Sequence, residues 1–188
     1  MRTKAGKNLR TVFALALAFC LFTGLWTKVA QAAGQNLDQK AEQIVKAQVS
    51  SKDSAKKKLK KLFTYVQKEY DYARKTGFEA YDGWEEDYAL EMFADKKGSC
   101  YHYAAAYAVL AKKATGYSVR IGLGQTNGFS GSLQKHAWTE VKISGKWYIC
   151  DPNMDKYAKD CSGAYCLKKR NGLKNTYDKF KNVKYVNV

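Results

Sequence analysis

The sequence predicts an α+β fold in which several helices precede an antiparallel sheet. The chain has 188 residues, a length that suits one compact domain after any processing. Hydrophobic residues make up 46% of it and aromatic residues 14%, with a single proline, so the chain can build a packed core. Apolar residues recur at helical spacing as far as Gly116, and beyond it they alternate with polar residues, as they do in strands.

Four helices are expected in the first part of the chain. We place them at residues 37–49, 51–73, 84–94 and 100–114. In the first two, apolar residues every three or four positions would form a buried stripe. The third carries acidic residues in its first turn, where the helix dipole favours them, and the fourth is rich in alanine and ends at Gly116.

Strands are expected after Gly116. Alternating apolar residues place them at residues 117–123, 135–143 and 146–151, with a last strand at 183–188. Residues 124–132 have the composition of a flexible loop, and Ser144-Gly145 that of a two-residue hairpin turn. The strands therefore follow the helices in the chain, which is the order typical of an α+β fold.

Residues 1–32 have the features of a secretory signal. Four basic residues precede an uncharged stretch at residues 11–26, and Ala30-Gln31-Ala32 matches the small-x-small pattern at which signal peptidase cleaves. We therefore expect cleavage near Ala32 and a protein that is secreted or associated with the cell envelope. The alternative is an uncleaved membrane anchor, and we expect no other membrane contact.

The chain is strongly basic, with a net charge of +16. Residues 1–32 hold five Lys and Arg and no acid, so the remainder is net +11. This surplus lies in residues 33–75 and 155–188, each net +6, on either side of a nearly neutral middle. Solvated helix faces are the simplest interpretation, and binding to an anionic cell-envelope polymer or an acidic substrate is the alternative. No nucleic-acid-binding motif is present, so a nucleic-acid partner is not expected.

Cys100 is the candidate nucleophile. It follows Gly98-Ser99 at the start of the fourth predicted helix. There, unpaired backbone N–H groups and the positive end of the helix dipole stabilise a thiolate and can also hold an oxyanion. Helical spacing places Cys100 on the same inward stripe as Tyr103 and Tyr107. A buried inert cysteine and one half of a disulfide are the alternatives.

A thiol nucleophile needs a base, and the sequence holds two histidines. His102 lies about 200° around the helix from Cys100, so we expect it to have a surface or packing role. His136 begins the second predicted strand and is the remaining candidate.

The predicted hairpin brings His136 close to Asp151. Counting back from a two-residue turn at residues 144–145 places Asp151 opposite Trp138. His136 and Asp151 are then diagonal neighbours on one face of the sheet, whereas a bulge would put them on opposite faces. We interpret His136 as the base that takes the proton of Cys100, and Asp151 as the group that orients the imidazole.

Three aromatic residues are further candidates for the site. Trp138 shares the face of His136, where it either walls the site or packs. Tyr81 and Trp84 lie upstream of Cys100 and could donate an O–H or N–H to an oxyanion. No metal or other cofactor is expected, because no histidine lies at ligand spacing beside the cysteines.

Three motifs occur in order along the chain: GSCYHYA at residues 98–104, HAWTEV at 136–141, and GKW followed by DP at 145–152. Over residues 84–153 the sequence resembles the core of the transglutaminase-like superfamily. The resemblance implies a papain-like core in which the Cys-bearing helix packs on an antiparallel sheet. It also implies Cys100, His136 and Asp151 as the catalytic triad, and no calcium site.

The signal pattern and this resemblance together predict a division of the chain into three parts. We expect residues 1–32 to be the signal peptide, 33–75 an N-terminal helical segment and 76–188 the catalytic domain, with 33–188 as one compact unit. We expect an exported cysteine enzyme that forms an acyl-thioester from peptide or glutamine-type amides of a peptide or protein substrate, then releases it to an amine or water. The alternatives are a peptidase that trims envelope peptides, and a non-enzymatic adhesin or scaffold that binds an anionic polymer.

The remaining cysteines leave the disulfide pattern open. Export permits disulfides, and Cys161 and Cys166 could close a short loop. Cys150 could instead reach either of them. Cys100 is expected to stay unpaired, because a disulfide there would abolish the nucleophile.

Overall fold

The computed structural model describes residues 36–158, 163–173 and 177–188. The chain divides into two units between Asp38 and Gln39, and the second unit, Gln39–Val188, contains Cys100, His136 and Asp151. The predicted signal segment at residues 1–32 lies outside the described residues. Among the helices that are described, none has the length and apolar character needed to cross a membrane.

The helices follow the predicted order. Residues 36–48 are helical, and the longer helices after them are α2 (Ala55–Glu69), α3 (Trp84–Asp95) and α4 (Cys100–Thr115). The second predicted helix, at residues 51–73, extends beyond the observed α2 at both ends. Ser54 caps α2, because its side chain accepts a hydrogen bond from the N–H of Lys57.

The chain leaves α2 early because the next residues form a strand. Asp71–Tyr72 (β1) pairs in parallel with Lys97–Gly98 (β2), the residues that lead directly into α4. No pattern in the sequence indicates this pairing, because the two segments are 26 positions apart and each is only two residues long. The pairing fixes the path by which the chain enters α4.

The main sheet has four antiparallel strands in the order β5-β4-β3-β6. They are β3 (Val119–Thr126), β4 (Gln134–Ile143), β5 (Lys146–Cys150) and β6 (Phe180–Asn187). The expected loop at residues 124–132 is therefore shorter than predicted. The strand β3 continues to Thr126 because it pairs with β4 on one side and β6 on the other.

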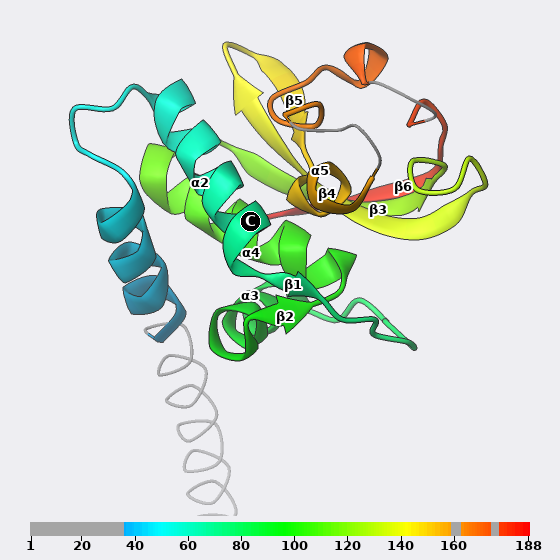
Figure 1. Cartoon of the computed structure of the whole chain (residues 1–188), viewed down its shortest axis with the longest axis horizontal. Coiled ribbons are helices and arrows are strands. Elements are labelled where there is room, and N and C mark those ends of the chain that lie inside the picture. The colour runs from blue at the N-terminus through cyan, green and yellow to red at the C-terminus, as the bar shows by residue number, and fades with distance from the viewer. Residues whose placement is uncertain (1–35, 159–162, 174–176) are drawn as a thin grey trace, which may run out of the picture. The chain divides into compact units, whose positions relative to one another are not determined.

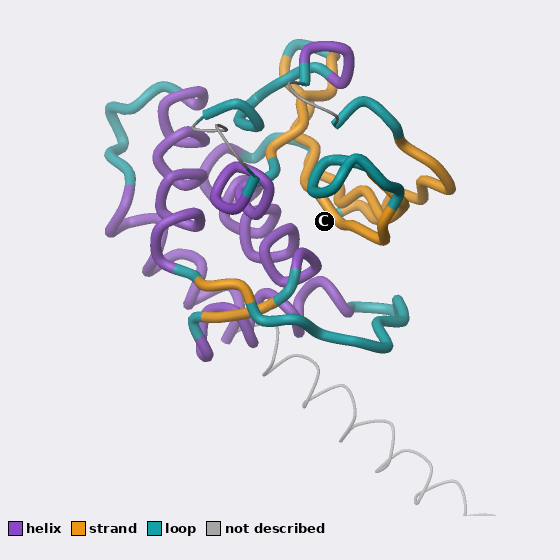
Figure 2. The backbone as a smooth tube through the Cα atoms, turned by 45° about the vertical axis from the view of Figure 1, so that its right-hand side comes forward, coloured by secondary structure: helices purple, strands orange, loops and turns teal. Residues whose placement is uncertain are grey.

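Helix α4 lies at the centre of the second unit. It contacts β3 and β4 on one side and α2 and α3 on others, as Figures 1 and 2 show. Five of its six alanines are buried, and their small side chains allow the neighbouring elements to approach closely. The Thr139 hydroxyl of β4 donates to the Ala104 carbonyl of α4 over 2.8 Å, which ties the sheet to the helix. The fold is the predicted α+β arrangement, with the Cys-bearing helix packed on the antiparallel sheet.

A short fifth helix and the C-terminal tail complete the fold. Helix α5 (Pro152–Tyr157) follows β5, and a 3₁₀ turn, η1 (Arg170–Gly172), precedes the last strand. Buried Asn127 anchors the tail: its side-chain N–H donates to Asp178 over 2.7 Å, and its side-chain oxygen accepts from the N–H groups of Asp178 and Lys179. The tail is therefore held against the end of β3.

Candidate active site

Cys100 is the first residue of α4 and is buried, with 7% of its surface exposed. It lines a pocket of about 800 Å³, whose far wall is the segment between β1 and α3. Its position at a helix N-terminus leaves its backbone N–H without an acceptor inside the helix. The thiol therefore lies at the positive end of the α4 dipole and opens onto a cavity.

His102 holds the start of α4 in place. The N–H of Ser99 donates to His102 Nδ1 over 3.1 Å, and His102 Nε2 lies 2.9 Å from Glu91 Oε2. Since Nδ1 accepts, the ring is the neutral tautomer with its proton on Nε2. Burial lowers the pKa of His102, in agreement with this neutral state. Of the two predicted roles, surface or packing, the structure shows the packing one.

Gly98 provides the space that His102 needs. A Cβ added at Gly98 would lie 2.5 Å from the His102 Cβ, closer than two carbons can approach. Gly98 therefore does more than separate the two helices on either side of it. Because it has no side chain, the His102 imidazole can pack against the backbone that leads to Cys100.

His136 and Asp151 lie in the predicted register. Every pair observed between β4 and β5, from Ile143 with Lys146 to Thr139 with Cys150, follows from a two-residue turn. His136 Nε2 lies 2.6 Å from Asp151 Oδ2, and both side chains are almost completely buried. The diagonal contact predicted from the hairpin is therefore present.

The carboxylate of Asp151 has two further hydrogen bonds. Its Oδ1 accepts from the N–H of Met154 over 3.0 Å, because Asp151 is the N-cap of α5. Its Oδ2 accepts from the Tyr177 hydroxyl over 2.9 Å. One carboxylate oxygen of Asp151 thus caps α5, and the other is hydrogen-bonded to both His136 and Tyr177. These contacts leave the carboxylate little freedom to rotate.

Tyr177 was missed in the sequence analysis. It lies in the irregular tail, 26 positions after Asp151, and no periodicity or motif singles it out. Its side chain is fully buried and its ring is stacked on Phe180 at a centroid distance of 5.2 Å. Tertiary contacts bring this segment to the site, through Asn127 and through the pairing of Phe180 with Thr126.

His136 is held in its charged form. Burial by itself would lower the pKa of His136, but the charge and hydrogen bond of Asp151, with a hydrogen bond to Cys100, raise it to about 10. Because Nε2 is engaged by Asp151, Nδ1 is the ring atom left for the thiol. The arrangement is a Cys100–His136–Asp151 series in which an imidazolium can stand beside a thiolate.

The three aromatic candidates lie at different places in the fold. Trp138 is fully buried, donates from Nε1 to Glu140 over 3.0 Å, and lies nearly parallel to the His136 ring at 6.4 Å. It therefore packs behind His136. The Tyr81 hydroxyl donates to Asp87. The Nε1 of Trp84 is buried and, within the described chain, has no hydrogen-bond partner, and neither side chain lines the pocket at Cys100.

A second pocket lies on the His136 side. It has a volume of about 280 Å³ and includes residues of β3, β4 and β6. The two pockets share Phe78, Tyr101 and Lys135. Phe78 is stacked on Tyr101 with 3.7 Å between ring centroids, so this aromatic pair lies between the approaches to the thiol and to the imidazole.

Cys150 and Cys166 line neither of these pockets. Burial raises the pKa of Cys150 to about 12 and also raises that of Cys166. Both carry free thiols, and Cys161 lies outside the described residues. The Cys161–Cys166 disulfide therefore stays a prediction. The described residues contain no cluster of three or more His, Cys, Asp or Glu side chains arranged for a metal ion.

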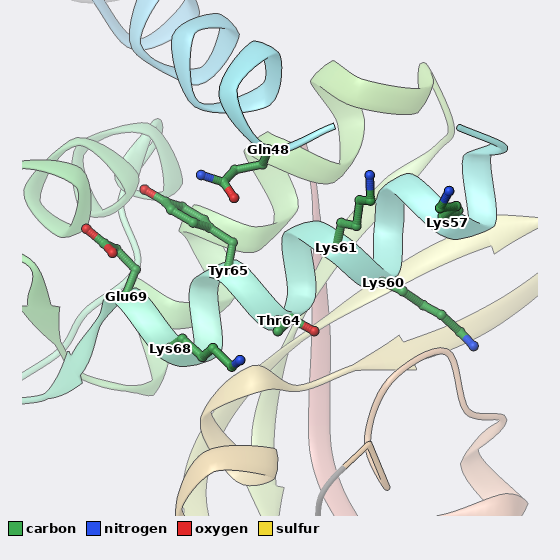
Figure 3. A pocket seen from close by; sticks show the side chains of 8 residues that line it. All are labelled: Gln48, Lys57, Lys60, Lys61, Thr64, Tyr65, Lys68 and Glu69. Carbon is green, nitrogen blue, oxygen red and sulfur yellow. The ribbon is translucent and has the colours of Figure 1, made fainter. Parts of the chain in front are cut away.

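The lysine-rich face of α2 forms a third pocket, of about 580 Å³. Lys57 and Lys61 both pair with the Asp53 carboxylate, at 2.8 and 2.6 Å. Figure 3 shows that Lys60 and Lys61 point in different directions from neighbouring positions of the helix. These side chains do not converge on one point, and binding of an anionic polymer at this face stays a prediction.

The chain is similar to known proteins in sequence pattern and in fold. The sequence pattern of the transglutaminase-like superfamily matches residues 42–152. A solved structure described as a candidate cysteine protease from Cytophaga hutchinsonii is similar at 14% identity and a TM-score of 0.50, over 80% of this chain and 51% of that one. A solved structure described as a TGase is similar at 19% identity and a TM-score of 0.46, over 63% of this chain and 31% of that one. The chain thus spans about half the length of the Cytophaga protein. No curated protein matches the sequence.

Proposed function

The chain belongs to the transglutaminase-like superfamily, and on that premise we propose that it is a cysteine-dependent enzyme acting on peptide or glutamine-type amides. The observation that carries the proposal is the buried His136, which is hydrogen-bonded to Asp151 at 2.6 Å and whose pKa is raised by Asp151 and also by Cys100. A structural histidine would need neither a buried carboxylate on its ring nor a helix N-terminal cysteine beside it.

In the first step the Cys100 thiolate attacks the amide carbonyl carbon. The carbonyl π electrons move to oxygen, and the backbone N–H of Cys100 is placed to donate to that oxyanion. The His136 imidazolium then gives its Nδ1 proton to the amide nitrogen, the C–N bond breaks and an amine leaves. An acyl-thioester remains on Cys100, and His136 is neutral.

In the second step the acceptor attacks the thioester carbonyl. His136 takes a proton from the acceptor, and the C–S bond breaks to return the Cys100 thiolate and the imidazolium. Asp151 does not exchange protons in this scheme. It keeps the Nε2–H of His136 pointing toward itself and stabilises the charge of the ring.

We propose water as the usual acceptor, so that the reaction is hydrolysis and the enzyme an amidase or peptidase. The pocket at His136 is bordered by Lys135 and Lys184. A protonated lysine side chain approaching this pocket would be repelled by both ammonium groups. Transfer of the acyl group to an amine is the second candidate reaction. Membership of the transglutaminase-like superfamily supports it.

The experiment compares two cysteine variants. Cys100→Ala should lower amide-cleaving activity by roughly 10³-fold or more, because the nucleophile is lost. Cys166→Ala, a cysteine outside both pockets, should leave activity unchanged. Activity that survives Cys100→Ala would overturn the proposal. Release of a free carboxylate in the presence of a labelled primary amine would indicate hydrolysis, and incorporation of the label would indicate transfer.

Thiol reactivity gives an independent readout. Cys100 should be alkylated by iodoacetamide near neutral pH much faster than Cys150, whose pKa burial raises to about 12. Peptide mapping after a short exposure identifies the modified cysteine. A Cys100 no more reactive than an ordinary free cysteine would favour the non-enzymatic adhesin or scaffold.

We further propose that the enzyme is exported and acts in the cell envelope or its surroundings. The basic, apolar and small-residue pattern of residues 1–32 supports this proposal. N-terminal sequencing of the protein recovered from the producing cells should begin at Ala33. A protein recovered from the cytoplasm with Met1 in place would contradict it.

A further inference from the structure

Cationic side chains surround the entrance to the site on both sides. The Cys100 pocket is lined by Arg74, Lys75 and Lys135, and the His136 pocket by Lys135 and Lys184. Because Lys135 lines both pockets, the positive charge continues from one side of the reacting pair to the other.

These cations are not equivalent, because one of them is already neutralised. The Lys75 ammonium lies 3.1 Å from Glu91 and over the ring of Tyr88 at 4.1 Å. Within the described parts of the chain, no ion pair involves Arg74, Lys135 or Lys184. Three positive charges therefore face the two pockets, and none of them is paired with a carboxylate of the described residues.

Carboxylates are nearly absent from the same walls. Of the described residues that line the two pockets, Glu79 alone is acidic. The polar residues Gln125 and Asn182 contact each other, with the Asn182 amide donating to the Gln125 oxygen over 3.4 Å. The lining therefore has a net positive charge on both the thiol side and the imidazole side.

This charge results from the fold and not from the local composition. Residues 76–154, which contain Cys100, His136 and Asp151, hold eight bases and nine acids. Five of those acids lie on α3, at Glu85, Glu86, Asp87, Glu91 and Asp95. Arg74 and Lys184 come from the two basic flanks of the chain and are brought to the cleft by the segment after β1 and by β6.

From this arrangement we infer that the substrate is a peptide segment with acidic side chains on both sides of the carbonyl that Cys100 attacks. The inference rests on the proposed function, since it names the substrate class of that same site. Asp and Glu side chains would pair with Arg74 and Lys135 on one side, and with Lys135 and Lys184 on the other. The stacked Phe78 and Tyr101 rings would lie against the peptide between these contacts.

Binding can be measured without turnover in the Cys100→Ala variant. Three fluorescein-labelled peptides share a neutral core and differ only in flanking residues, which are Asp/Glu, Asn/Gln or Lys. Fluorescence anisotropy should give the order acidic, neutral, basic from tightest to weakest. Each exposed ion pair should contribute roughly two- to fivefold, so that the acidic and neutral peptides differ by about tenfold.

Salt and substitutions locate the effect. The preference should nearly vanish in about 1 M NaCl, where the Debye length is about 3 Å. Lys135→Gln, introduced together with Cys100→Ala, should reduce the acidic-to-neutral ratio more than Arg74→Gln or Lys184→Gln, because Lys135 borders both pockets. The matched control is Lys60→Gln on α2, which lines neither of these pockets. Thermal melts verify that each variant is folded.

Equal binding of the three peptides would overturn the inference. It would also be overturned if Lys60→Gln and Lys135→Gln reduced the acidic-to-neutral binding ratio equally. Cleavage of internally quenched versions of the peptides by the unsubstituted enzyme is measured in parallel. If the acidic preference in binding is present but no peptide is cleaved, the proposed function fails and the inferred specificity of the cleft stands. If all three peptides are cleaved equally with Cys100 dependence, the function stands and the inferred specificity fails.

Discussion

The two histidines show how residues of one type take opposite protonation states in one domain. His102 accepts from a backbone N–H through Nδ1, so it must be neutral to keep that contact. His136 faces the buried Asp151 carboxylate, whose negative charge stabilises the doubly protonated, positively charged imidazolium ring. A neutral histidine fixes the helix that carries the thiol, while a charged one can stand beside the thiolate.

Asp151→Asn tests the role of the carboxylate at the residue scale. Loss of the negative charge should lower the pKa of His136 from about 10 toward the usual 6.5. Since the imidazolium is the active form, the alkaline limb of kcat/KM should move to lower pH. The rate at neutral pH should fall by roughly 10²- to 10⁴-fold. A pH profile of kcat/KM with an unmoved alkaline limb would contradict the assignment.

Tyr177→Phe offers a milder version of the same change. It removes one hydrogen bond to Asp151 Oδ2 while keeping the ring in its packing position. We interpret Tyr177 as a positioning residue, and expect a smaller shift of the His136 limb in the profile. Tyr107→Phe is the matched control, because the buried Tyr107 hydroxyl donates to the Leu59 carbonyl and not to the site. The two variants should therefore differ in their pH profiles.

At the scale of elements, the β4–β5 hairpin decides whether His136 meets Asp151. Both residues of its turn have positive φ, 49° for Ser144 and 78° for Gly145. A two-residue hairpin turn requires this conformation, because its twist then matches the twist of the two strands. A register shift by one residue would move Asp151 to the other face of the sheet. The local turn thus determines a contact between side chains 15 positions apart.

Gly145→Ala should destabilise the protein by about 1–2 kcal/mol, because an L-residue is strained at this positive φ. Nothing lies within 4 Å of a Cβ added at Gly145, so the cost would come from the backbone and not from a clash. Gly172→Ala is the control, since that site is equally open and its φ is not positive. Urea unfolding of the two variants measures the difference, and equal stability would contradict the strain argument.

At the scale of the whole molecule, the two histidines set opposite pH dependences of stability. The raised pKa of His136 stabilises the fold fully below about pH 6.5, and this contribution is lost as the pH rises toward about 10. The lowered pKa of His102 stabilises the fold above about pH 6.5, and this contribution is lost as the pH falls below that value. Stability should therefore be greatest near neutral pH.

Unfolding free energy measured by urea at a series of pH values checks this prediction. The Cys100→Ala variant, in which the nucleophile adds no titration of its own, should lose up to about 1.4 kcal/mol per pH unit between about pH 6.5 and 7.5, below the range around pH 8.5 in which unfolded cysteines titrate. His136→Gln should flatten this alkaline slope, whereas His102→Gln should flatten the slope just below pH 6.5. An alkaline slope that is the same with and without His136 would contradict the prediction.

Much of the candidate site could be predicted because it depends on local chain geometry. Gly98-Ser99 marks the start of the helix that carries Cys100, and helix periodicity turns His102 away from it. The turn at Ser144-Gly145 sets the strand register by counting. Each of these inferences spans at most a few residues or one hairpin, so backbone sterics and hydrogen bonding determine it.

What the sequence by itself determined, then, is the α+β class and the relation between His136 and Asp151. Only the tertiary structure decided the Tyr177 contact, the β1–β2 pairing, the packing role of Trp138 and the collection of Arg74, Lys135 and Lys184 around one cleft. The physical reason is the separation along the chain over which each interaction acts. Periodicity and turn geometry act between near neighbours, whereas these features arise when the buried core brings together segments that carry no mutual signal along the chain.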